Sequence, residues 1–120
     1  MTDDVLLSES AGDTSVDVHR MARGDTRPAV EATLLAGSEP FSLDDARHVT
    51  FRLCEKDGVE ECFENRASIV DEQPGHVRYE WGRGETDTPG LYRGRFVVNY
   101  RGRESRSFPN RGHITVIIER

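Results

Sequence analysis

Two cysteines, Cys54 and Cys62, have the spacing that most directly suggests chemistry. They flank Asp57-Gly58, a dipeptide that favours a tight turn between two β-strands. A hairpin loop of three or five residues would place the two thiols opposite each other, within reach of a disulfide, whereas a two-residue loop would not. Two reduced thiols are the commoner outcome for such a pair, so both states stay open.

The other side chains capable of catalysis or metal binding do not form a recognisable pattern. The histidines lack the paired spacing of zinc sites, and the serines lie outside any nucleophile elbow. Neighbouring carboxylates point to opposite faces of a strand or lie in solvated loops. We therefore expect no catalytic, cofactor-binding or metal site and no enzymatic activity. The residues considered are His19, His48, His76, His113, Ser8, Ser10, Ser15, Ser107 and the pairs Asp3-Asp4, Asp44-Asp45 and Glu60-Glu61.

An arginine-rich segment, RGRESRSFPNRG at residues 101–112, is the clearest candidate contact region. Basic side chains near Phe108 superficially suit a nucleic-acid backbone with base stacking. Glu104 and the negative charge of the chain count against that interpretation. A solvated loop, or a rim that pairs with an acidic neighbouring subunit, fits better. The candidate assembly contacts are Arg101, Arg103, Arg106 and Arg111.

The overall charge also argues against nucleic acid and anionic membranes as partners. The chain has 22 acidic and 16 basic residues in 120, a net charge of −6. All of the basic residues except Lys56 are arginine, a skew that a halophilic or high-GC host would produce. Neither a membrane-spanning run nor a secretion signal is expected, and the length is that of one domain.

The elements that would carry these side chains are short strands. The longest alternating run follows the turn at Thr88 to Gly90, and it predicts a central strand ending at Tyr100. One face of this strand holds Tyr92, Gly94, Phe96, Val98 and Tyr100. Tyr92 lies just after the turn and two residues before a small inward position. That placement is typical of a tyrosine corner, in which the phenol bonds back to nearby backbone.

Alternation elsewhere predicts further strands separated by Gly- and Pro-containing turns. They lie at about residues 15–21, 29–35, 49–53, 61–70, 77–81 and 114–118. Alternation predicts that the residues on one face of these strands are buried, among them Val16, Val18, Val49, Phe51, Leu53, Val77, Tyr79, Trp81, Ile114, Val116 and Ile118. A short helical turn is expected at Leu43 to Arg47. Residues 1–14 are expected to be a flexible N-terminal arm and residues 15–120 one domain. These patterns predict an all-β, immunoglobulin-like antiparallel β-sandwich of about seven strands.

The order of several motifs resembles a known family. The pieces are GDTRPAVEATL at residues 24–34, LDDARHVTFRL at 43–53, ASIVDEQPGHVRYEW at 67–81, GETDTPGLYRGRFVV at 84–98 and SFPNRGHITVII at 107–118. In this order they are similar to the N-terminal immunoglobulin-like domain of phage baseplate upper proteins. Members of that family usually continue into coiled or receptor-facing segments, whereas this sequence contains one module.

This resemblance implies a structural component of a tailed virus, placed in the tail or another external part of the virion and made in the host cytoplasm. Its partners would be other virion proteins and further copies in a symmetric homo-oligomer, with neither nucleic acid nor membrane bound. The family supplies no catalytic residues. A glycan- or receptor-binding module is the alternative, and it would require Tyr79, Trp81 or Tyr92 to be exposed for stacking.

Overall fold

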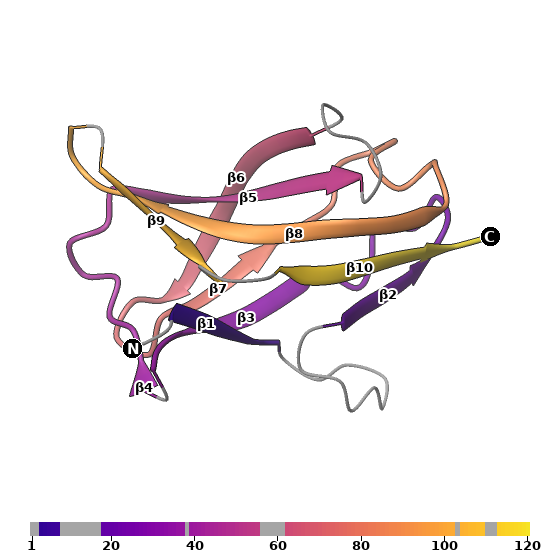
Figure 1. Ribbon diagram of the computed structural model, residues 1–120. Coiled ribbons are helices and arrows are strands. Elements are labelled where there is room, and N and C mark those ends of the chain that lie inside the picture. Colours follow the sequence, from indigo (N-terminus) through magenta and orange to yellow (C-terminus); the bar gives the residue numbers. More distant parts are fainter. Residues whose placement is uncertain (1–2, 8–17, 38, 56–61, 103, 110–112) are drawn as a thin grey trace.

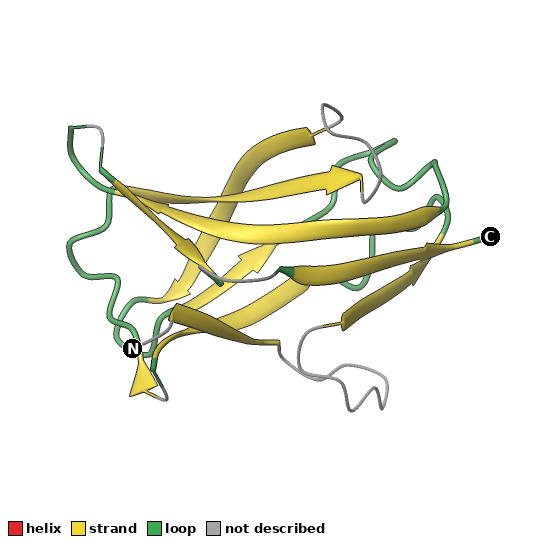
Figure 2. Cartoon of the chain, in the orientation of Figure 1, coloured by secondary structure: helices red, strands yellow, loops and turns green. Residues whose placement is uncertain are grey.

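The computed structural model describes residues 3–7, 18–37, 39–55, 62–102, 104–109 and 113–120, which form ten strands and no helix. The predicted all-β class is confirmed, and Figure 2 shows strands joined only by loops and turns. The strands are β1 (Asp3–Leu7), β2 (Val18–Ala22), β3 (Val30–Ala36), β4 (Glu39–Pro40), β5 (His48–Glu55), β6 (Cys62–Asp71), β7 (His76–Tyr79), β8 (Gly90–Asn99), β9 (Ser105–Phe108) and β10 (Ile114–Glu119).

The strands form one curled sheet in the order β1-β3-β7-β6-β5-β8-β10-β2, with β4 added to β3 and β9 to β8. Strand β6 makes the bend, because its first part pairs with β5 up to Ala67 and its last part pairs with β7 from Ser68 onward. Figure 1 shows the resulting half-barrel, with β1 and β3 facing β8 and β10. The inward side chains of both halves meet in one core.

The predicted inward positions of the longest strands are confirmed. Val49, Phe51 and Leu53 on β5 are buried, and Phe96 and Val98 on β8 are buried opposite them. Strand β8 also has a position that requires glycine. A Cβ atom at Gly94 would lie 2.7 Å from the ring of Phe51, so the absence of a side chain lets that ring lie across β8.

The predicted antiparallel sandwich of about seven strands is not confirmed, because ten strands form a single mixed sheet. The pair β2–β10 is parallel. The two earliest strands, β1 and β2, lie at opposite ends of the strand order, where β1 pairs with β3 and β2 with β10. Pairing between residues this far apart in sequence is set by the packing of the whole core, so strand periodicity does not reveal it.

Four local predictions are corrected by the structure. Residues 3–7 of the predicted flexible arm form β1, with Val5 buried against the core, while the rest of residues 1–14 lie outside the described part. The predicted helical turn at Leu43 to Arg47 is a loop, because Leu43 packs into the core and its N–H donates to the Glu72 carbonyl. Ser105–Phe108 is strand β9 instead of a loop. On β2 the buried side chains are His19 and Met21, not Val18.

Candidate functional site

A hydrogen-bonded cluster around Glu85 lies beside the aromatic core at the end of the sheet near residues 82–88. The Glu85 carboxylate accepts hydrogen bonds from Tyr79 Oη at 2.6 Å, Asn65 Nδ2 at 2.7 Å and the Gly82 N–H at 2.6 Å. Burial, followed by the hydrogen bond to Glu85, raises the pKa of Tyr79 above its ordinary value. The donors and the acceptor satisfy one another, so this cluster fixes the loop to the core.

Aromatic rings fill the space next to this cluster. Phe51 stacks on Tyr79 with ring centroids 4.9 Å apart and meets Trp81 edge-on at 6.0 Å. Tyr79 and Trp81 are 2% and 5% exposed, which confirms their predicted burial. Neither ring is therefore available to stack on a glycan, as the alternative binding role would require.

Tyr92 makes the backbone contact that its position after the turn predicted. Its Oη donates a hydrogen bond to the Thr88 carbonyl at 2.6 Å, which ties the start of β8 to the preceding turn. Burial, and then the neighbouring Glu55 carboxylate, raise the pKa of this phenol. The ring is half-buried and contributes to the core.

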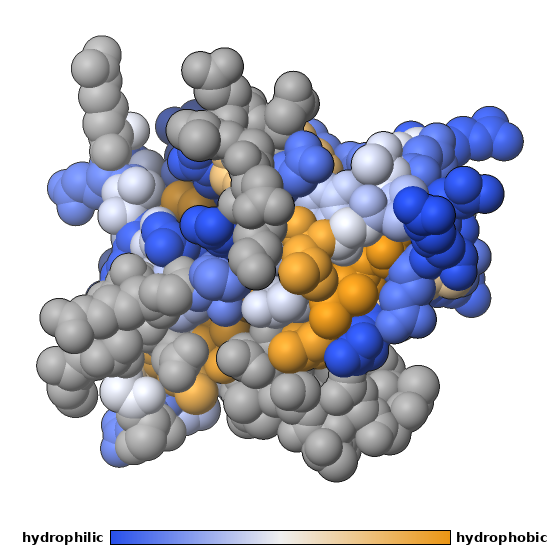
Figure 3. All heavy atoms as spheres, turned by 45° about the vertical axis from the view of Figure 1, so that its right-hand side comes forward, coloured by the Kyte–Doolittle hydropathy of each residue, from blue (hydrophilic) through white to orange (hydrophobic). Residues whose placement is uncertain are grey.

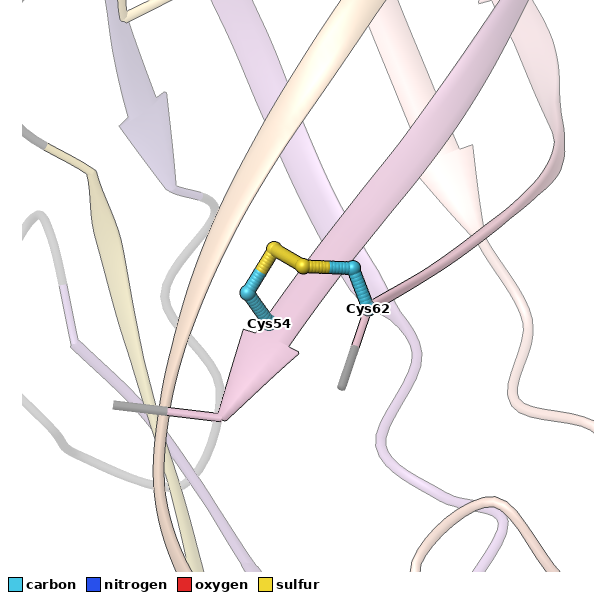
Figure 4. Close-up of a disulfide and its surroundings, with 2 residues drawn as sticks. All are labelled: Cys54 and Cys62. Carbon is cyan, nitrogen blue, oxygen red and sulfur yellow. A yellow bond between two sulfur atoms is a disulfide. The ribbon is translucent and has the colours of Figure 1, made fainter. Parts of the chain in front are cut away.

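Cys54 and Cys62 are joined by a disulfide in the structure. The two residues are direct partners in the β5–β6 register, with their Cα atoms 4.1 Å apart, and Figure 4 shows the bond crossing between the strands. The predicted Asp57-Gly58 turn lies outside the described residues. The bond lies on the outward side of the sheet, so it fastens the end of this hairpin without entering the core.

A groove lies at the opposite end of the sheet, between the 41–47 loop and the β8–β9 hairpin. Phe41 and Tyr100 supply its aromatic surface, and the remaining lining is polar or charged. The Arg47 N–H donates to the Asn99 carbonyl at 2.7 Å, and this bond connects the two walls. The lining residues are Phe41, Ser42, Asp44, Asp45, Ala46, Arg47, Tyr100, Arg101, Glu104, Ser105 and Arg106.

The groove holds polar groups that the fold itself does not fully use. Ser42 Oγ is buried and makes no hydrogen bond among the described residues. A buried hydroxyl without a protein partner is costly, so it normally bonds to a water or to another molecule, and the same holds for His76 Nε2 and Trp81 Nε1 elsewhere in the fold. The exposed carboxylates of Asp44 and Asp45 lie in the same lining as the exposed guanidinium of Arg101.

Two of the four predicted arginine contacts belong to this groove. Arg101 is exposed on its rim, and Arg106 places its guanidinium 4.5 Å from the centre of the Phe41 ring. That cation–π contact holds Arg106 against the 41–47 loop. Arg103 and Arg111 lie outside the described residues. The sequence did not reveal the other wall of the groove, because residues 41–47 are distant from the arginine segment along the chain.

The described residues contain no group of three His, Cys, Asp or Glu side chains that could hold a metal ion. The same ranges include no helix suited to crossing a membrane. In the view of Figure 3 an apolar stretch runs through the middle, smaller apolar areas lie to its left, and hydrophilic atoms surround them. The groove combines two signs of charge with the aromatic side chains of Phe41 and Tyr100.

Comparison of the chain with protein-family models gives no match. A search of curated proteins gives no match either.

Proposed function

We propose that this protein is a non-catalytic assembly module that docks other proteins through the groove between the 41–47 loop and the β8–β9 hairpin. The observation that carries the proposal is the groove itself, which combines the exposed charges of Asp44, Asp45 and Arg101 with a buried Ser42 hydroxyl that has no hydrogen-bond partner among the described residues. Groups of this kind gain most when a partner surface supplies complementary charges and donors.

An immunoglobulin-like arrangement of the strands is part of this proposal. In such domains the first, second, fifth and fourth strands form one sheet, and the third, sixth and seventh form the other. The order β1-β3-β7-β6 followed by β5-β8-β10 has the same sequence of neighbours when β1 is taken as the first strand and β2, β4 and β9 are set aside. The Tyr92 to Thr88 bond at the start of β8 also supports it, since a tyrosine corner occurs at that strand.

The assembly we propose is the particle of a tailed virus. The motif order that resembles phage baseplate upper proteins supports this step, together with the absence of a recognisable catalytic pattern in the sequence. In this proposal the protein is made in the host cytoplasm and joins the tail or another external structure. Its partners are other virion proteins and further copies of itself in a symmetric homo-oligomer.

Peptide mass spectrometry on purified virus particles from the source organism tests this function. Antibody labelling in the electron microscope then places the protein in the particle. Detection at a fixed copy number, with label at one structure, supports the proposal. Absence from clean particles overturns the virion role, and a glycan- or receptor-binding role then becomes the leading hypothesis.

A further inference from the structure

The disulfide between Cys54 and Cys62 joins two strand segments that the sheet holds unequally. Strand β5 lies between β6 and β8 and pairs with both along most of its length. Residues 62–67 of β6 pair with β5 alone among the described strands, because β7 pairs with β6 only from Ser68 onward. Cys54 is therefore fixed from two sides, whereas Cys62 begins a segment that is paired on one side.

The first two residues of β6 have few other attachments within the described part of the chain. Side-chain hydrogen bonds to this segment begin at Glu64, whose carboxylate accepts one from Thr50 at 2.5 Å. Phe63 is partly buried against the core, with its ring centre 6.4 Å from that of Tyr79. Cys62 and Phe63 are thus held by the β5 ladder, by the packing of one ring and by the disulfide. Breaking the disulfide should loosen these two residues first.

The position of the disulfide makes it accessible to a small thiol. Both cysteines are half-buried on the outward side of the sheet. Cys54 has Cys62 on one side and Arg93 on the other in the strand register, so its sulfur is flanked on both sides. Cys62 has a register neighbour on one side only within the described strands, so its sulfur is the more open of the two. Exposed disulfides are those that exchange most readily with thiols.

Arg93 favours Cys54 as the sulfur that leaves as a thiolate. Side chains directly opposite each other on adjacent strands have Cβ atoms about 4.5–5.5 Å apart. The guanidinium of Arg93 is exposed on the same side of the sheet as Cys54, and a positive charge at this range stabilises a thiolate. Arg93 has an interaction partner as well, so its effect on the sulfur should be moderate.

We propose that the Cys54–Cys62 disulfide is a reversible redox switch, open as two thiols in the host cytoplasm and closed after the virus particle leaves the cell. The exchange chemistry depends on the structure alone, whereas the assignment of the two states to the inside and outside of the host rests on the proposed virion function. Cytoplasmic thiols keep cysteine pairs reduced, and disulfides persist outside the cell. Closing the bond fastens the start of β6 once the particle is assembled.

Opening needs two molecules of a small thiol such as glutathione. The first thiolate attacks Cys62 Sγ, the S–S bond breaks, and its electron pair leaves on Cys54 Sγ, which takes a proton from water. The second thiolate attacks the glutathione sulfur of the mixed disulfide, which releases glutathione disulfide and the Cys62 thiolate. Closing is the reverse reaction, with glutathione disulfide as the oxidant. The pairing of Leu53 with Phe63 keeps the two thiols adjacent, so neither direction requires unfolding.

Brief exposure of the full chain to glutathione, followed by acid quenching and peptide mass spectrometry, tests the exchange. The mixed disulfide should form on Cys62 at least about tenfold more often than on Cys54. Complete reduction should leave the circular dichroism unchanged and speed amide hydrogen exchange at Cys62 and Phe63 by at least about tenfold, with the amides of β5 unaffected. Equal labelling of the two cysteines, a bond that glutathione does not open, or unfolding on reduction overturns the switch.

Two variants of β8 test which sulfur leaves. Arg93→Ala and Arg95→Ala each remove one positive charge from the outward side of β8, so both weaken the general attraction of negatively charged glutathione. Arg95 lies opposite Arg52 instead of a cysteine, which makes it the matched control. Arg93→Ala should slow reduction about threefold more than Arg95→Ala. Equal rates for the two variants would contradict the assignment of Cys54 as the leaving thiolate.

Alkylation of thiols in intact infected cells and in purified released particles, read by mass spectrometry, tests where the switch operates. The pair should be alkylated inside the cells and bonded in the released particles. A bonded pair in both samples, or free thiols in both, overturns the proposed change of state. Absence of the protein from the particles rejects the virion role alone, and the glutathione experiment then decides whether the disulfide is a switch.

Discussion

The two ends of strand β8 differ in what their charged side chains contact. Near its start, Tyr92 bonds to Thr88, and Glu85 accepts three hydrogen bonds beside a packed group of rings. Near its end, Tyr100 and the β9 hairpin face a groove with exposed charges and an unpaired Ser42 hydroxyl. In the proposed function, residues near the start of β8 contribute most to the stability of the fold, and residues near its end contact partner proteins.

Phe51 should be the most sensitive position at the stabilising end. Its ring contacts Tyr79, Trp81 and Phe96 and covers Gly94, so Phe51→Ala leaves a large cavity. We expect a loss of about 3–5 kcal/mol in the free energy of unfolding, measured by urea denaturation. A loss below about 1 kcal/mol would show that this end is not the centre of stability.

The disulfide should have the next largest effect. Replacing Cys54 and Cys62 together with serine removes a constraint on a short loop, which the chain-entropy relation values at about 2–3 kcal/mol. The thermal midpoint of the double variant should be lower than that of the untreated wild type. Treating the wild type with a reductant should lower its midpoint by a similar amount. An unchanged midpoint under both conditions would mean that the bond contributes nothing to the fold.

Glu85→Ala should cost about 2 kcal/mol, because it leaves Tyr79 Oη, the Asn65 amide and the Gly82 N–H without their shared acceptor. Glu104→Ala is the matched control, since Glu104 is an exposed carboxylate of the groove. Its expected effect on unfolding is below about 0.5 kcal/mol. Equal losses for the two variants would remove the distinction between the ends.

Tyr79 should also make stability depend on alkaline pH. Its pKa is raised in the folded state, so the neutral phenol is favoured by folding. This contribution is fully present below the ordinary tyrosine pKa of about 10 and is lost as the pH rises above it. Unfolding measured between pH 8 and 11 should therefore show a smaller alkaline loss for Tyr79→Phe than for the wild type. Part of the loss of unfolding free energy that remains in Tyr79→Phe at alkaline pH comes from Tyr92, whose pKa is raised as well.

The sequence predicted the parts of this fold that depend on alternation within one strand. The inward residues of β5, β8 and β10 and the burial of Trp81 follow from a period of two, and the Tyr92 bond follows from a local turn. These features depend on residues close together in the chain. Local pattern was therefore enough to identify the part of the core that these strands supply.

The features that sequence analysis missed depend on distant pairing. Strand β1 is short and pairs with β3, and the parallel β2–β10 pair joins residues 18–22 to residues 115–119. Sequence analysis did not single out Glu85, whose partners Asn65 and Tyr79 are brought to it only by folding. The groove likewise combines Arg101 with residues 41–47, so only one of its walls was visible as an arginine-rich segment.

The most direct test of this difference between the two ends of β8 uses two charge-neutral double variants. The first carries Asp44→Ala and Arg101→Ala in the groove, and the second carries Asp87→Ala and Arg83→Ala at the other end, all at exposed positions. Quantitative mass spectrometry of purified particles gives the copy number of each, and urea denaturation gives its stability. We predict that the copy number of the groove variant in the particle is at least about tenfold lower than that of the wild type. Its free energy of unfolding should change by less than about 0.5 kcal/mol. The second variant should keep the copy number and the unfolding free energy of the wild type. Wild-type incorporation of the groove variant would contradict the assignment of contact to this end of the molecule.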